Sequence, residues 1–114
     1  MDDDQLRALA AAGGVAQVTF YSGFLREGSG EATIADAVRH LMHMIDVAGI
    51  DSVGIGSDFD GDGGVAGLRT ASELINFTRR LMAEGLTTKH LRKLWGANFV
   101  RVLSKAQYGC EFRI

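Results

Sequence analysis

Apolar residues recur three or four positions apart in four segments of the chain, which is the spacing of one buried helix face. The first segment begins with an acidic turn at residues 2–4, where carboxylates favour a helix start, and stops at a glycine pair. The others cover residues 33–49, 70–85 and the region after 87–88, with Gly96 as a candidate break in the last. The apolar residues of the four segments are Leu6, Leu9 and Ala10; Ile34, Val38, Leu41, Ile45 and Ala48; Leu74, Phe77, Leu81 and Met82; and Leu91, Leu94, Trp95, Phe99, Val102 and Leu103.

Capping signals define the start of two of these helices. Thr33 is followed by Asp36, and Thr70 by Glu73, at the spacing of a capping box. Gly49 stands just after the last apolar position of its helix, where a left-handed residue commonly ends a helix. We therefore expect helices that begin after Thr33 and after Thr70.

Two short segments have strand character. Residues 15–21 combine β-branched and aromatic side chains, and residues 50–57 contain a short apolar run spaced by glycines. The glycine-rich residues 22–31 are expected to form a loop. One helix between two apolar strands is a βαβ unit, which predicts parallel strands with a right-handed crossover.

The predicted sheet is too small to stand alone. Parallel strands are normally buried on both faces within sheets of several strands, and only two strand segments lie among at least four helices. Either other copies of the chain supply further strands, or the chain is part of a larger α/β protein. The second interpretation is favoured, so we expect an incomplete α/β unit of the order βαβα.

The strongest chemical signal follows the second strand segment. Residues 53–56 alternate apolar side chains with glycine, and Asp58, Asp60 and Asp62 then occupy alternate positions in a glycine-rich loop. Glycines within a strand mark close backbone approach or a barrel bend, and acids just beyond a strand end are typical of active sites. Asp58 is the candidate catalytic residue. The alternative is that its carboxylate only caps backbone amides of the loop.

The same loop permits a calcium-binding interpretation. Asp58, Asp60, Asp62 and Gly63 fit the opening positions of an EF-hand calcium loop. Position twelve, which needs a bidentate glutamate, is Arg69, and a strand rather than a helix precedes the loop. A calcium-binding loop protein is therefore an alternative from a different functional class.

Composition and charge exclude other classes. Hydrophobic residues make up 46% and charged residues 23% of the 114 residues, which is typical of one folded globular domain. A formal net charge of −2, with scattered Lys and Arg, gives no footprint for nucleic acid. The acidic start is unlike a secretory signal, and no apolar run approaches the roughly 20 residues that span a bilayer. We expect a cytoplasmic protein with no membrane segment.

Three ordered segments resemble one known family. They are residues 13–21 (Gly-Gly-Val-Ala-Gln-Val-Thr-Phe-Tyr), residues 48–61 (Ala-Gly-Ile-Asp-Ser-Val-Gly-Ile-Gly-Ser-Asp-Phe-Asp-Gly) and residues 95–102 (Trp-Gly-Ala-Asn-Phe-Val-Arg-Val). They look like the C-terminal part of the renal (membrane) dipeptidase family, and Gly-Ser-Asp-Phe-Asp-Gly is the most specific match. The resemblance implies the last two strands of a (β/α)8 TIM barrel of the amidohydrolase type, which hydrolyses dipeptides at a binuclear zinc site.

The resemblance also implies roles for single residues. Asp58 falls on the family's active-site aspartate, which faces the metal-bound water and handles its proton. Tyr21 is expected to line the substrate pocket, and Asp60 to support the loop. The family's histidine, aspartate and bridging glutamate ligands have no counterpart here, so no metal ligand is assigned. The arginine that binds the substrate carboxylate would fall immediately before Met1.

Four other residues have simple interpretations. His40 and His43, with Asp36 one turn earlier, have a spacing that can bind a metal, but their helix would belong to the outer ring of a barrel. We interpret this pair and His90 as structural or solvated. The single cysteine, Cys110, cannot form an internal disulfide and is interpreted as a passive thiol.

Two interpretations of the whole chain follow. As the C-terminal part of a zinc dipeptidase barrel, residues 1–114 would be inactive alone because the metal ligands are missing, and the open sheet edge would cause self-association. As a non-catalytic remnant or assembly module, the chain would keep the barrel end without its metals. Metal-ligand motifs upstream of Met1 would distinguish the two.

Overall fold

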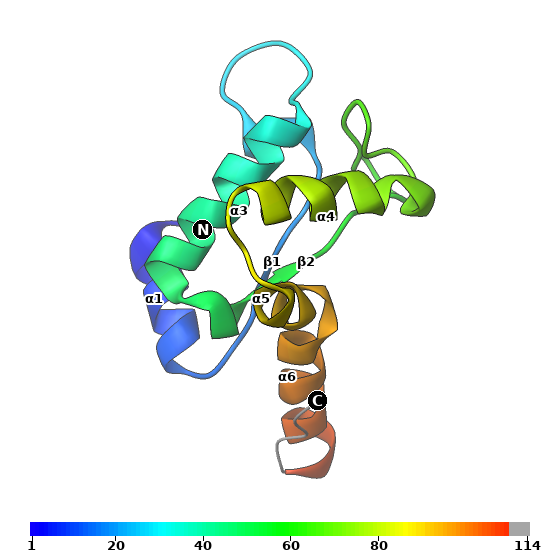
Figure 1. Cartoon of the computed structure of the whole chain (residues 1–114). Helices are drawn as coiled ribbons and strands as arrows, with labels where there is room; N and C mark the ends of the chain where they lie inside the picture. Colours follow the sequence, from blue (N-terminus) through cyan, green and yellow to red (C-terminus); the bar gives the residue numbers. More distant parts are fainter. Residues whose placement is uncertain (110–114) are drawn as a thin grey trace.

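The computed structural model describes residues 1–109 and shows helices arranged around a small parallel sheet (Figure 1). Cys110, which the sequence analysis singled out, lies outside the described residues. In chain order the elements are α1 (Asp3–Ala11), β1 (Ala16–Val18), α2 (Ser22–Leu25), α3 (Ile34–Ala48), the 3₁₀ turn η1 (Ile50–Ser52), β2 (Val53–Ile55), the 3₁₀ turn η2 (Ala71–Glu73), α4 (Leu74–Ala83), α5 (Thr88–Arg92), the π-helical turn η3 (Lys93–Ala97) and α6 (Asn98–Tyr108).

The two strands β1 and β2 pair in parallel, in the register that places Ala16 beside Val53. This confirms the predicted parallel pair. Each strand is only three residues long, however, which is shorter than predicted. The start of the second strand segment forms η1 instead, because Gly49 has a φ of +85° and its carbonyl accepts a hydrogen bond from the Ser52 N–H at 3.2 Å. The chain therefore makes one more turn before it enters the sheet.

Helix α3 begins and ends where the sequence predicts. The Asp36 N–H donates to Thr33 Oγ1 at 3.2 Å, and the Thr33 N–H donates to Asp36 Oδ2 at 2.9 Å, which completes the capping box. Gly49 ends the helix with its N–H on the Ile45 carbonyl, in a backbone conformation that favours glycine. The helix buries the side chains of Ala37, Val38, Leu41 and Met44.

Two local predictions were wrong. The segment after β1 is not only a loop, because Ser22 to Leu25 form the single turn α2, which is too short to produce a periodic pattern. Thr70 and Glu73 do not form a capping box either. Glu73 Oε2 accepts the Arg69 N–H at 2.8 Å, and the Thr70 hydroxyl bonds to the Ser72 hydroxyl. The chain turns through η2 first, so α4 begins at Leu74 without a side-chain cap.

The last helical segment is continuous rather than broken. Thr87 and His90 form a capping box at the start of α5, so His90 is structural, as predicted. At Gly96 the helix widens into the π turn η3 and then continues as α6. A π turn accommodates a change of helical register without ending the helix. The Trp95 indole N–H donates to Thr78 Oγ1 at 2.9 Å and ties this turn to α4.

One hydrophobic core connects the strands with the surrounding helices. Phe20 packs edge-on against Phe77 of α4, with ring centroids 5.1 Å apart, and both rings are fully buried. Helices α1 and α3 lie side by side, and η3 packs against β2 (Figure 1). The largest fully buried side chains are Phe20, Leu41, Val53, Val65, Leu68, Phe77, Leu81 and Leu94.

Asn98 and Arg101 fasten the amino ends of both strands to α6. The buried Asn98 amide donates to the Ile50 and Val53 carbonyls, at 2.6 and 2.7 Å. Arg101 donates from its guanidinium to the Asp51 carbonyl at 2.8 Å and to the Gly13 carbonyl at 3.3 Å. One short stretch of α6 thus satisfies backbone acceptors that precede each strand.

Replacing Asn98 with alanine should lower the free energy of unfolding by about 2–4 kcal/mol, because one buried and one part-buried carbonyl would lose their donor. Urea unfolding at micromolar concentration measures this change. Gln107→Ala on the exposed side of the same helix is the control and should change stability by less than about 0.5 kcal/mol. An equal effect of the two substitutions would show that the Asn98 bonds contribute little.

The purified chain should self-associate, because each strand has only one neighbour among the described residues and so presents an open backbone edge. Sedimentation velocity over a range of concentrations should show species larger than a monomer, and a hydrophobic dye should bind. A compact monomer that does not bind the dye would contradict the proposed open edge.

Candidate functional site

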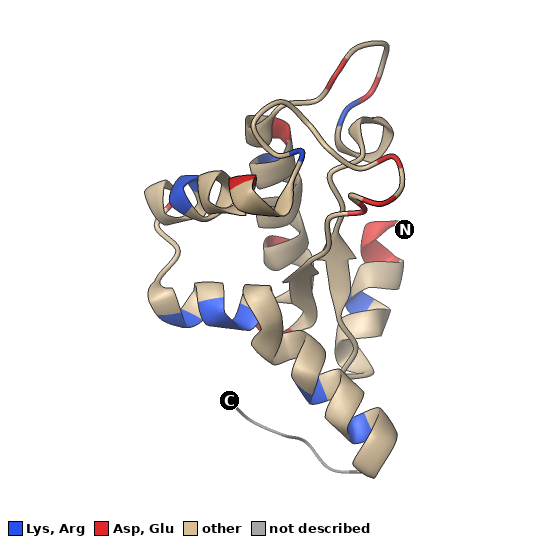
Figure 2. Ribbon diagram, turned by 90° about the vertical axis from the view of Figure 1, so that its right-hand side faces the viewer, with Lys and Arg blue, Asp and Glu red and all other residues tan. Residues whose placement is uncertain are grey.

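The loops that follow β1 and β2 meet at the carboxyl ends of the strands (Figures 1 and 2). Backbone hydrogen bonds continue the contact beyond the sheet. The Gly56 N–H donates to the Val18 carbonyl at 2.8 Å, and the Phe20 N–H donates to the Ser57 carbonyl at 3.2 Å. The Phe20 carbonyl then accepts the Gly64 N–H at 2.9 Å. These bonds place the acidic loop, coloured red at the right of Figure 2, directly beside the end of β1.

Asp58 is the first residue beyond this backbone pairing and adopts an unusual conformation. Its φ is +65°, and it is the one non-glycine residue with positive φ between residues 1 and 109. Its backbone carbonyl accepts two hydrogen bonds, from Gly61 at 3.0 Å and from Gly63 at 2.9 Å. A left-handed non-glycine residue costs roughly 1 kcal/mol or more, and such residues cluster at functional sites. The backbone is therefore held in a strained turn that aims this side chain.

The Asp58 carboxylate makes no hydrogen bond or ion pair with any other residue of the described segment, and the residue is exposed. The loop amides bond to the Asp58 main-chain carbonyl instead of its side chain. The Asp58 side chain therefore does not cap the backbone amides of its own loop. An exposed carboxylate in a constrained turn can accept a proton from a molecule bound beside the acidic loop, or donate a proton to it.

Two glycines make the turn around Asp58 possible. A Cβ atom on Gly63 would lie 2.2 Å from the Ser57 carbonyl oxygen and 2.6 Å from that of Asp58. On Gly61 it would lie 2.8 Å from Asp58 Oδ1, the end of a side chain. The first clash is with backbone and cannot be relieved by a rotation, so only glycine fits at position 63.

Asp60 and Asp62 are also exposed, and neither bonds to another described residue. The role of Asp60 in supporting the loop therefore stays a prediction. Nowhere in residues 1–109 do three or more His, Cys, Asp or Glu side chains converge to hold a metal ion. The three loop carboxylates of the calcium interpretation consequently do not gather around a common point.

Tyr21 lies beyond the end of β1 and directly before α2, and its neighbour Phe20 bonds to Ser57 and Gly64 of the acidic loop. Its ring is half-buried and packs edge-on against Phe24 of α2, with ring centroids 4.9 Å apart. The ring also covers Gly23, where a Cβ atom would approach it to 2.6 Å. Sequence reasoning selected Tyr21 and missed Phe24, although the aromatic pair at positions i and i+3 was visible.

An ion pair joins the two loops of this edge. The Arg69 guanidinium bonds to the Glu31 carboxylate, which connects the loop after β2 with the loop after β1. The Ser22 hydroxyl accepts the Ala32 N–H at 3.0 Å and closes the loop after β1 onto its own start. Both side chains of the ion pair are about half exposed, so the pair contributes little stability but restricts the relative position of the loops.

The histidines of α3 do not form a metal site. His43 Nε2 lies 2.8 Å from Asp3 Oδ1 of α1, whereas Asp36 bonds to Thr33 and Arg39. The Thr33 N–H and the Arg39 guanidinium lower the pKa of Asp36, and burial lowers the pKa of His40. These residues join and cap helices, which agrees with their structural interpretation.

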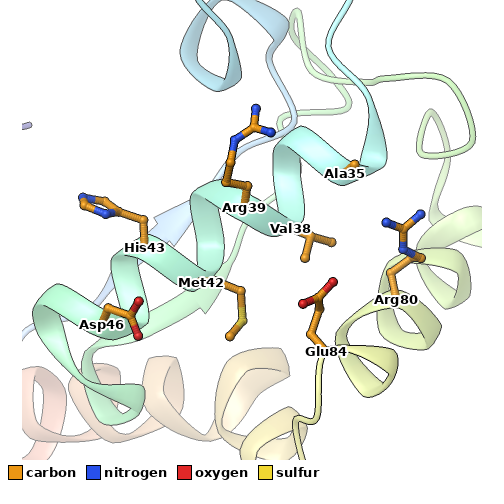
Figure 3. A pocket seen from close by; sticks show the side chains of 8 residues that line it. All are labelled: Ala35, Val38, Arg39, Met42, His43, Asp46, Arg80 and Glu84. Atoms are coloured by element: carbon orange, nitrogen blue, oxygen red, sulfur yellow. The ribbon is translucent and has the colours of Figure 1, made fainter.

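A pocket of about 410 Å³ lies between α3 and α4, to the side of the strands (Figure 3). Val38 and Met42 contribute apolar wall, and charged side chains of both signs surround them. The complete lining is Ala35, Val38, Arg39, Met42, His43, Asp46, Arg80 and Glu84. None of these residues belongs to the loops around Asp58, so the pocket is separate from the candidate catalytic edge.

Replacing Gly63 with alanine should disrupt the loop far more than replacing Gly61, because only the first Cβ collides with backbone. We expect Gly63→Ala to lower the free energy of unfolding by about 2 kcal/mol or more, and Gly61→Ala by about 1 kcal/mol or less. Urea unfolding gives both values, and amide NMR shifts report the loop itself. Equal effects would contradict the tight turn at Asp58.

Comparison with known sequences identifies the family. The sequence model described as Membrane dipeptidase (Peptidase family M19) matches residues 1–111. An uncharacterized dipeptidase of Schizosaccharomyces pombe is 42% identical over 108 residues, which cover 92% of this chain and 26% of that protein. The dipeptidase tcpJ of Claviceps purpurea is 30% identical over 95 residues, which cover 82% of this chain and 22% of that protein. The chain spans about a quarter of the length of these relatives.

Solved structures share the fold. The probable dipeptidase PvdM from Pseudomonas aeruginosa superposes with a TM-score of 0.90 at 23% identity, over 94% of this chain and 40% of that one. The dipeptidase AC, a metallo peptidase, gives a TM-score of 0.85 at 34% identity, over 91% of this chain and 32% of its own. A metallo peptidase from Rhodobacter sphaeroides, liganded with a phosphinate mimic of the dipeptide L-Ala-D-Ala, gives 0.80 at 34% identity, over 87% and 29%.

None of the helices between residues 1 and 109 combines the length and the apolar character that a membrane span requires. The structural matches confirm the predicted fold class, an α/β arrangement with two parallel strands that corresponds to part of the TIM-barrel dipeptidases. The family match covers nearly the whole chain, and the family predicted from the three sequence segments is therefore confirmed. The chain belongs to the membrane dipeptidase family, peptidase family M19.

Proposed function

We propose that residues 1–114 form the C-terminal part of a metal-dependent dipeptidase barrel and that Asp58 is its catalytic carboxylate. The observation that carries this proposal is the free Asp58 side chain in a left-handed turn at the strand ends. In barrels of this class the catalytic residues lie at the carboxyl ends of the strands. Membership of a dipeptidase family makes dipeptides the expected substrates.

In the proposed reaction Asp58 acts as a general base and then as a general acid. Its carboxylate accepts a proton from the attacking water and returns it to the leaving amine, so that the peptide bond is cleaved without a net change in the residue. Tyr21, half-buried just beyond the neighbouring strand, would line the same site and contact the substrate. Asp60 would help to shape the loop.

The described residues do not fit a complete metal centre. A catalytic zinc needs about three protein ligands, and no such group converges between residues 1 and 109. We propose that the family's zinc ligands belong to a preceding part of the barrel, and that this chain alone binds zinc weakly and hydrolyses no dipeptide. A non-catalytic module remains the competing function, and the following experiment separates the two.

The test uses a hybrid barrel, in which a related enzyme supplies the part that precedes this chain. In this hybrid barrel the chain follows the preceding residues of the Rhodobacter sphaeroides metallo peptidase, to which it is 34% identical. Asp58→Asn should lower kcat for L-Ala-D-Ala by about 100-fold or more, because the amide cannot accept a proton. Asparagine tolerates the left-handed conformation, so the loop and the bound metal should be retained.

Asp60→Asn is the matched control in the same loop, and it should change kcat by less than about 5-fold. Metal content and circular dichroism of each variant show whether the loop has stayed folded. Equal losses of activity in both variants, together with loss of metal, would show that the acidic loop acts only as a structural unit. A folded, metal-loaded hybrid barrel without activity would favour the non-catalytic module.

A further inference from the structure

The Phe24 side chain is unusually exposed for an aromatic ring at this edge. Its exposed fraction is 67%, whereas Phe20, four residues earlier in the chain, is fully buried. Most of the other large exposed apolar side chains lie on helices, such as Ile75 and Met82 on α4 and Phe99 on α6. Phe24 differs from these residues because it belongs to α2, in the segment that follows the carboxyl end of β1, and Asp58 likewise follows the carboxyl end of β2.

The ring of Phe24 is held in place although it is exposed. The Phe24 N–H donates to the Tyr21 carbonyl at 3.0 Å, and the Leu25 N–H donates to the same oxygen at 3.3 Å. The Tyr21 ring packs edge-on against it at 4.9 Å, and the buried Leu25 anchors the other end of α2. A rigid aromatic ring loses little conformational entropy when a ligand packs on it.

Backbone hydrogen bonds connect the aromatic pair Tyr21 and Phe24 to the acidic loop around Asp58. Phe20 immediately precedes Tyr21 and bonds through its N–H to Ser57, the residue before Asp58. Its carbonyl accepts the Gly64 N–H at the far end of the acidic loop. The residues directly before Tyr21 and Asp58 are therefore hydrogen-bonded to each other, which places both residues beyond the carboxyl ends of the neighbouring strands.

From this geometry we infer that Phe24, supported by Tyr21, is a specificity-determining residue that packs against an apolar side chain of the dipeptide. The inference rests on the proposed dipeptidase function, and it adds a preference for substrates with an apolar side chain. Because Phe24 contacts only the side chain in this arrangement, a dipeptide without side chains would not use it. The preference should appear in kcat/KM, since the contact is made in both the bound and the reacting substrate.

The hybrid barrel tests this inference with two kinds of substrate. Phe24→Ala should lower kcat/KM about 10-fold or more for L-Leu-L-Ala or for L-Ala-L-Leu, and which of the two is affected identifies the position of the side chain. Hydrolysis of Gly-Gly should change less than about 2-fold. Phe24→Leu keeps an apolar contact and should recover most of the loss, whereas Phe99→Ala on α6 should alter neither substrate.

The outcomes separate this inference from the proposed function. Equal losses for L-Leu-L-Ala, L-Ala-L-Leu and Gly-Gly would show that Phe24 only stabilises the loop, and unchanged kinetics for all three would show that it does not meet the substrate. Either result overturns the inference while the dipeptidase activity stands. A folded hybrid barrel that hydrolyses none of these dipeptides contradicts the proposed function and the inference together.

Discussion

The hydrogen bonds from the Asn98 amide to the Ile50 and Val53 carbonyls are the interaction on which the arrangement of the strands depends. A two-stranded parallel sheet has few hydrogen bonds of its own, and β1 and β2 are each only three residues long. Asn98 and Arg101 secure the amino ends of the strands from α6. With the amino ends of the strands secured, the carboxyl ends and the loops that follow them lie together at the opposite end of the sheet.

The candidate site consists of the strand pair that α6 secures and the strained turn at Asp58. Asp58 has positive φ, and its carbonyl accepts bonds from two glycine amides, one of which has no room for a Cβ atom. Glycine at position 58 would remove the backbone strain, but it would also remove the carboxylate. A carboxylate held at this energetic cost without a local hydrogen-bond partner is expected of a residue that acts on a bound molecule.

The relatives explain why a small sheet can be stable as part of a protein. Dipeptidase chains that share this fold extend well beyond the matched segment, since this chain covers 29–40% of the three solved chains described above. Among residues 1–109 the structure contains two adjacent strands and their helices, and each strand keeps one open edge, as strands do where a larger sheet would continue. The lining of the pocket between α3 and α4 includes no residue of the loops around Asp58, and the pocket does not enter the proposed chemistry.

The sequence by itself determined the features that depend on local patterns. Helical periodicity and the Thr33–Asp36 box located α3, and the change to apolar residues spaced by glycine located β2 and the acidic loop. The family segments then indicated Asp58 as the candidate catalytic residue, because they contain chemistry-bearing residues in a specific order. Local reasoning failed at Thr70 and Glu73, where the same spacing forms a 3₁₀ turn and Glu73 bonds to Arg69.

Only the tertiary structure decided which residues meet across long sequence separations. Asn98 lies 45 residues from Val53, and no periodic pattern shows that its amide donates to the carbonyl of this first residue of β2. The left-handed conformation of Asp58 and the exposure of Phe24 were likewise invisible, because both are properties of the folded chain that no local pattern encodes. Local patterns report which faces of an element are apolar, whereas hydrogen-bond partners and exposure are set by packing between elements.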